Sequence, residues 1–124
     1  MPLEFDENSR EWLATAREHL DAARVHALAP RFRCFHAQRA VELSLKGVLV
    51  RHGVEHPRTH ALARLIEILP VDAPADIDLS ARLTIYAVEE MYPETLTALD
   101  ETDAREAVEL AAAVVEWAAS LIDP

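Results

Sequence analysis

The sequence predicts an all-α protein: an antiparallel up-and-down four-helix bundle with one additional short helix. Alanine and leucine, both strong helix formers, dominate a hydrophobic fraction of 51%, while only 6% of residues are aromatic. The 124 residues contain two glycines, fewer than the turns of a sheet protein of this length would need. No repeat or linker divides the chain, so residues 1–124 are expected to form a single domain.

The first helix is expected over about residues 9–28. Asn8 and Glu11 have the spacing of a capping box, with Asn in place of Ser or Thr. Apolar residues then recur on one helical face: Trp12, Leu13, Ala16, Leu20, Ala23 and Ala27. This pattern predicts an amphipathic helix with Trp12 in the core.

The second helix is expected over about residues 32–52, after Pro30, which suits a first helical turn. One apolar stripe comprises Ala37, Val41, Leu45, Val48 and Leu49, and a second comprises Ala40, Leu43, Gly47 and Val50. A helix that is apolar on two sides is either central to its bundle or also faces a partner chain. Ala40 and Gly47 would allow another helix to approach closely, and Gly53 is a suitable terminator.

A short third helix is expected over residues 61–69. Thr59 can act as its N-cap, and Pro70 ends it. The next segment, 71–78, is acidic and contains a proline, so we expect a surface loop there.

The fourth and last helices are predicted from their caps and stops. Asp78 or Ser80 can cap a helix that runs to about Met91, because Pro93 stops it. The last helix is expected to run to about Ile122. Three residues can open it: Asp100, Thr102 and Asp103.

The charge and cysteine content narrow the classes of function. A formal charge of −10 and a pI near 4.9 disfavour bulk DNA binding and binding to anionic membranes. No apolar run approaches the roughly 20 residues that span a bilayer, and residues 1–10 lack the features of a signal peptide. Cys34 is the sole cysteine and cannot form an internal disulfide. We therefore expect a soluble, cytoplasmic protein.

Four segments in order resemble the HEPN family. Residues 34–47, CFHAQRAVELSLKG, resemble its FHAQ-type start followed by A-x-E-x-x-L-K. Residues 57–62, PRTHAL, are similar to its THxL segment, and residues 86–93, YAVEEMYP, to its Y-x-x-x-x-R-Y-P segment. Residues 103–107, DAREA, open the final helix in the typical way. The resemblance covers nearly the whole chain.

This resemblance implies a helical bundle that is usually a homodimer. Such proteins are often paired with a minimal nucleotidyltransferase, sometimes as a toxin–antitoxin couple. Some members are metal-independent RNases that use an R-x(4–6)-H motif. Others lack this motif and are thought to bind nucleotides or to serve as assembly modules.

The chain departs from the family at the RNase motif. Met91 stands where an arginine is usual, and no histidine follows His60, so the late motif cannot be built. Two R-x(4)-H strings occur earlier, Arg31 to His36 and Arg51 to His56. Arg51 and His56 remain candidate catalytic residues, and the alternative interpretation is that they are solvated surface residues.

Basic and aromatic residues suggest a nucleotide site, because phosphates favour positive charge and bases favour flat apolar surfaces. The candidate ligand-binding residues are His36, Arg39, Lys46, Arg58, His60, Tyr86 and Tyr92. In the alternative interpretation, Arg39 and Lys46 only pair with Glu42, Glu89 or Glu90, and the tyrosines only cover the core.

The histidines do not predict a metal site. His52, His56 and His60 are evenly spaced, but Gly53 and Pro57 interrupt any helix that would align them. No cysteine joins them, and a zinc site normally needs four ligands, or three and water. We expect neither a metal nor a cofactor.

The leading hypothesis is a non-catalytic HEPN-type nucleotide-binding or assembly module. It would form a homodimer and work with a nucleotidyltransferase partner in a toxin–antitoxin-like pair. The alternative is a metal-independent RNase toxin whose Arg/His site lies outside the usual position. The missing late motif favours the module.

Overall fold

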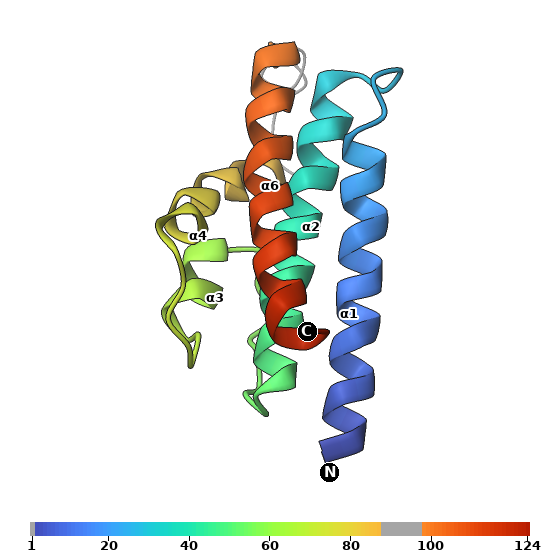
Figure 1. The fold of residues 1–124 in the computed structure, drawn as a ribbon. Coiled ribbons are helices and arrows are strands. Elements are labelled where there is room, and N and C mark those ends of the chain that lie inside the picture. The colour runs from blue at the N-terminus through green and yellow to red at the C-terminus, as the bar shows by residue number, and fades with distance from the viewer. Residues whose placement is uncertain (1, 88–97) are drawn as a thin grey trace.

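Three long helices form the body of the molecule (Figure 1). The computed structural model describes residues 2–87 and 98–124, with side chains from residue 8 onward. The long helices are α1 (Pro2–Ala23), α2 (Pro30–Arg51) and α6 (Glu101–Ile122), and each pair of them is in contact. Helix α1 runs antiparallel to α2 and α6 (Figure 1). The predicted all-α bundle is confirmed.

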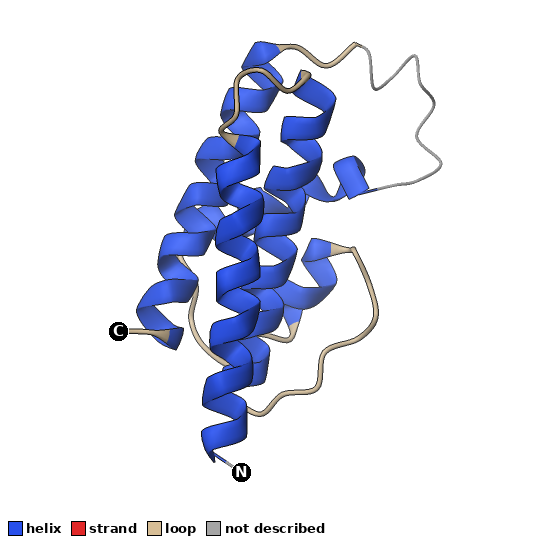
Figure 2. Ribbon diagram, turned by 90° about the vertical axis from the view of Figure 1, so that its right-hand side faces the viewer, coloured by secondary structure: helices blue, strands red, loops and turns tan. Residues whose placement is uncertain are grey.

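Three short elements pack on the side of α2 and α6 that lies away from α1 (Figure 1). They are α3 (Leu62–Glu67), α4 (Ala75–Ser80) and the 3₁₀ helix η1 (Ala81–Ala87). Figure 2 shows helices joined by loops throughout the described residues, with no strand among them. None of the helices in this part of the chain combines the length and hydrophobicity that crossing a membrane requires.

Helix α2 is the centre of the bundle. It contacts α1, α6, α3 and η1, and every residue from 40 to 49 is buried. An ideal Cβ at Gly47 would lie 3.1 Å from the Cβ of Trp12 and 3.2 Å from Cδ1 of Ile122. Glycine therefore lets α1 and α6 pack close to α2 at this position. The two apolar stripes of α2 are both explained by contacts within the chain.

The predicted boundaries of α1 were wrong at both ends. The helix already includes Asn8, because it begins at Pro2, a residue that suits a first helical turn. It ends at Ala23, before Ala27, and the Ala23 carbonyl accepts a 2.8 Å hydrogen bond from Nε of Arg33. A side chain from α2 thus satisfies a carbonyl that a longer helix would have paired itself.

The predicted ends of α2 and α6 agree well with the structure. Pro30 lies in the first turn of α2, and Gly53 follows its end with a φ of +71°. Among the three possible caps of α6, Asp100 is the N-cap. It forms a capping box with Asp103, in which each side chain accepts a hydrogen bond from the other's backbone N–H.

The short helices differ from the prediction in their starts. The N-cap of α3 is Ala61, and Thr59 instead accepts a hydrogen bond from the Ala61 N–H. Helix α4 begins inside the predicted loop 71–78, directly after Pro74, and Asp76 lies in its first turn. Negative charge in a first turn favours helix formation, so the acidic residues favour α4. The predicted end at Met91 lies outside the described residues.

Candidate ligand site between α1 and α2

A buried carboxylate on α2 collects four side chains. Glu42 is 1% exposed. Its Oε1 accepts hydrogen bonds from Gln38 Nε2 at 3.0 Å and His60 Nδ1 at 2.8 Å. Its Oε2 accepts from Arg39 at 2.8 Å and Lys46 at 2.9 Å. Residues three or four apart share one side of a helix, so the HAQRAVELSLK segment itself assembles most of this cluster.

The Glu42 cluster carries more positive than negative charge. Burial alone would raise the pKa of Glu42, but hydrogen bonds from Gln38, His60 and Lys46, with the Lys46 charge, hold it below its usual value. Glu42 is therefore ionised at neutral pH and pairs with both Arg39 and Lys46. The Arg39 side chain is 27% exposed, so part of its guanidinium faces solvent.

The loop after α2 brings His60 to this cluster. Gly53 adopts the left-handed conformation that lets the chain leave α2. The Leu62 N–H, at the start of α3, donates to the Thr84 hydroxyl at 3.0 Å and fixes α3 against η1. These contacts position a residue that is 18 places from Glu42 in the sequence.

The predicted ligand-binding residues are distributed over several places. Arg39, Lys46 and His60 meet at Glu42, whereas Arg58 is exposed in the loop before α3. Tyr92, Glu89 and Glu90 lie outside the described residues.

Tyr86 is half-buried in η1, packs against the core and is hydrogen-bonded to Cys34. Burial raises the pKa of Tyr86 to about 12 and that of the Cys34 thiol to about 11. Neither group is ionised at neutral pH, so Cys34 is a buried thiol that is not a nucleophile.

His36 forms a pair with His19 of α1. Their Nδ1 atoms are 2.9 Å apart, and the ring centroids are 5.2 Å apart. At these two distances the Nδ1 atoms point toward each other. One Nδ1 must therefore donate a hydrogen bond and the other must accept it. Burial lowers the pKa of both, and the charge of His36 lowers that of His19 further.

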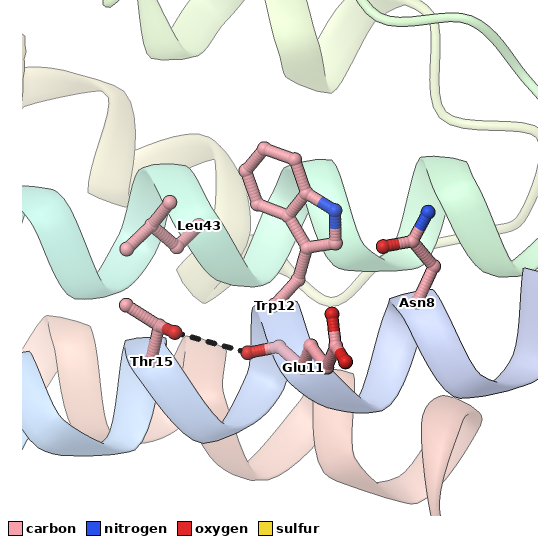
Figure 3. A pocket seen from close by; sticks show the side chains of 5 residues that line it. All are labelled: Asn8, Glu11, Trp12, Thr15 and Leu43. Carbon is pink, nitrogen blue, oxygen red and sulfur yellow. Dashed lines mark hydrogen bonds between the residues drawn. The ribbon is translucent and has the colours of Figure 1, made fainter.

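A pocket of about 320 Å³ is lined by residues of α1 and α2 (Figure 3). The Trp12 indole projects from α1 toward α2, between Leu43 and Asn8 (Figure 3). Thr15 and Glu11 complete the lining, and the Thr15 hydroxyl donates to the Glu11 carbonyl at 3.0 Å. The pocket combines an aromatic surface with polar groups, as small-molecule sites do.

The sequence pattern predicts Trp12 as core packing, and the structure instead places its indole at the wall of this pocket. The signal was present: Asn8, Trp12, Thr15 and His19 follow one another at spacings of four, three and four, which places them on one side of α1. Arg39 is four residues from Leu43, so its charge lies one turn from the pocket.

The two early Arg/His strings are placed as follows. Arg31 lies over the Phe32 ring at 4.8 Å, and His36 pairs with α1. His56 packs edge-on against Trp12, with ring centroids 5.0 Å apart, and its Nδ1 is buried without a hydrogen-bond partner in the described part of the chain. Arg51 is the last residue of α2.

The evenly spaced histidines contact three different groups. His52 Nδ1 lies 2.9 Å from the Val48 carbonyl, His56 contacts Trp12, and His60 contacts Glu42. Within residues 2–87 and 98–124, no three histidine, cysteine or acidic side chains are grouped so that they could hold a metal ion.

Comparison with known proteins gives one family and two similar structures. The family model of the HEPN domain matches residues 9–121. TT1696 from Thermus thermophilus has a crystal structure with a TM-score of 0.81 and 29% identity, over 90% of this chain and 96% of that one. ST0689, an archaeal HEPN homologue, has a TM-score of 0.77 and 26% identity, over 93% and 98%. No match is found among the curated proteins.

Proposed function

This chain belongs to the HEPN family, and from that premise we propose that it is a non-catalytic module that binds a nucleotide and assembles with partner proteins. The nucleotide would lie along the groove between α1 and α2. The observation that carries the proposal is the position of Arg39, one helical turn from the aromatic pocket at Trp12 and Leu43.

The groove offers a complementary group for each part of a nucleotide. The Trp12 indole and Leu43 provide an apolar surface for a base, and stacking on an aromatic ring contributes about 1–3 kcal/mol per base. Arg39 uses one nitrogen for Glu42, and the other donors of its guanidinium remain for a phosphate. Lys46 adds positive charge to the same cluster, and His60 adds a polar ring.

Tryptophan fluorescence tests this proposal directly. The chain has two tryptophans, Trp12 at the pocket and Trp117 on α6, so each can be removed in turn. We expect AMP, ATP or GTP to change the emission of wild type and of Trp117→Phe saturably, while Trp12→Phe loses the change. Arg39→Gln should weaken binding roughly tenfold, the value of one charge-assisted hydrogen bond. A response that survives in Trp12→Phe, or no response at all, would contradict the proposal.

Homodimerisation is the second part of the proposal. The first two turns of α2 present Phe32 and Phe35, which are 47% and 39% exposed and three residues apart. Exposed aromatic pairs on one helical face are typical of interfaces. A second copy of this chain would bury them symmetrically. Light scattering should show that Phe32→Ser with Phe35→Ser lowers the dimer fraction, whereas the matched control Leu79→Ser, at a residue that is 51% exposed, does not.

The partner protein and the non-catalytic role are the third part of the proposal. Family resemblance favours a nucleotidyltransferase partner in a toxin–antitoxin-like pair, and binding of this chain to the purified enzyme tests it. The non-catalytic function is preferred because no histidine follows His60, so the late R-x(4–6)-H motif is missing. RNA cleavage by pure protein that is lost in Arg51→Ala or His56→Ala would favour the RNase toxin instead.

A further inference from the structure

Arg33 is a buried arginine that joins three helix ends. It is 3% exposed, although arginine is almost never buried without partners. Its Nε donates to the Ala23 carbonyl at the end of α1, and its Nη1 donates to Glu101 Oε2 at 2.6 Å at the start of α6. Nη2 has no hydrogen-bond partner among the described residues.

A cavity of about 350 Å³ lies against Arg33. The charged or titratable side chains that line it are Arg24, His26, Arg33, Glu101, Arg105 and Glu109. Arg33 and Glu101 neutralise each other, which leaves Arg24 and Arg105 against the single carboxylate of Glu109. Neither Arg24 nor Arg105 forms an ion pair within the part of the chain that the structure describes. The lining of the cavity is therefore locally cationic, although the whole chain has a formal charge of −10.

We propose that this cavity binds the phosphate group of a small phosphorylated molecule. A guanidinium presents parallel donors that match phosphate oxygens, and Arg33 is held in place by its two other bonds. Its Nη2, with Arg24 and Arg105, supplies donors from α2, α6 and the end of α1. The volume lies at the small end of the range for ligand sites, which favours a compact ligand over a polymer.

This site is separate from the groove of the proposed function. Arg33 and Arg39, the proposed phosphate ligand of the groove, are six residues apart on α2, or about 9 Å along the helix axis. The two sites share no lining residue. Variants in one cavity therefore leave the other intact, and each proposal can fail alone.

Nuclear magnetic resonance can observe the buried arginine itself. We expect the Nε–H signal of Arg33 to shift saturably when inorganic phosphate is titrated at constant ionic strength, and not when chloride replaces it. Arg105→Gln should weaken phosphate binding roughly tenfold, as expected for one lost charge-assisted contact. Arg64→Gln, at an exposed arginine of α3, is the matched control and should bind as wild type does.

A second variant should change phosphate binding in the opposite direction. Glu101→Gln removes the carboxylate that competes for Arg33, so phosphate should bind several-fold more tightly. Followed through the Arg33 Nε–H signal, which reports this cavity and not the groove, AMP should bind no more weakly than a 5′-phosphorylated oligonucleotide. The proposal is overturned if phosphate and chloride act alike, if Arg105→Gln binds as wild type does, if Glu101→Gln weakens binding, or if the oligonucleotide binds more tightly than AMP.

Discussion

Glu42→Gln tests how much the buried ionic cluster contributes to stability. The substitution preserves shape but removes the charge that Arg39 and Lys46 share. The Lys46 side chain is 10% exposed and would be left as a buried cation without its anion. The expected result is a large loss of folding free energy, because a buried ion that loses its partner keeps the full cost of desolvation.

The magnitude follows from burial. Breaking a buried ion pair costs about 3–5 kcal/mol, and we take about 3 kcal/mol because the glutamine oxygen still accepts one hydrogen bond. A chain of 124 residues has an unfolding entropy of about 0.26 kcal/mol/K. The melting temperature should therefore fall by about 11 °C. His60 is largely exposed, so the change in its bond to Glu42 is not added to this loss of folding free energy.

Calorimetry and urea unfolding measure both quantities, and a double-mutant cycle isolates the pair. Lys46→Met combined with Glu42→Gln should destabilise less than the sum of the single variants by at least about 1 kcal/mol. The pKa of Glu42 is below the ordinary value of 4.5, so its contribution is fully present above pH 4.5 and is lost as the pH falls through the folded pKa. A fall in melting temperature below about 2 °C, or additive single variants, would refute the reasoning.

Three further predictions concern other contacts. The pKa values of His19 and His36 are below 6.5 in the fold, so their contribution to stability is complete above pH 6.5 and is lost as the pH falls through the lower values. Urea unfolding should therefore give a lower free energy of unfolding at about pH 5.5 than at about pH 7.5, and His19→Gln with His36→Gln should reduce that difference. Gly47→Val should lower stability by about 1–3 kcal/mol in thermal unfolding, because even a Cβ there lies 3.1 Å from a neighbour on α1; an unchanged melting temperature would mean that α1 moves away freely. Gly53→Ala should cost about 1–2 kcal/mol through its φ of +71°, with Gly53→Asn less costly in the same assay, and equal losses would point to a cause other than backbone conformation.

The sequence by itself determined what depends on residues close together in the chain. The all-α class follows from composition and periodicity. The pairing of Glu42 with Arg39 and Lys46 spans only three or four residues, so helical geometry alone brings these side chains together, whereas the sequence left three possible caps for α6, of which the structure has Asp100. The capping-box spacing at Asn8 shows the limit of local signals, because a helix that begins earlier overrides it.

Tertiary structure decided everything that depends on how separate segments meet. His60 reaches Glu42 only through the loop after α2, and His19 meets His36 only because α1 and α2 pack in one register. The role of Trp12 as a pocket wall and the gathering of arginines around Arg33 likewise need the relative placement of α1, α2 and α6. These contacts follow from the packing of one buried helix against its neighbours, which no local spacing encodes.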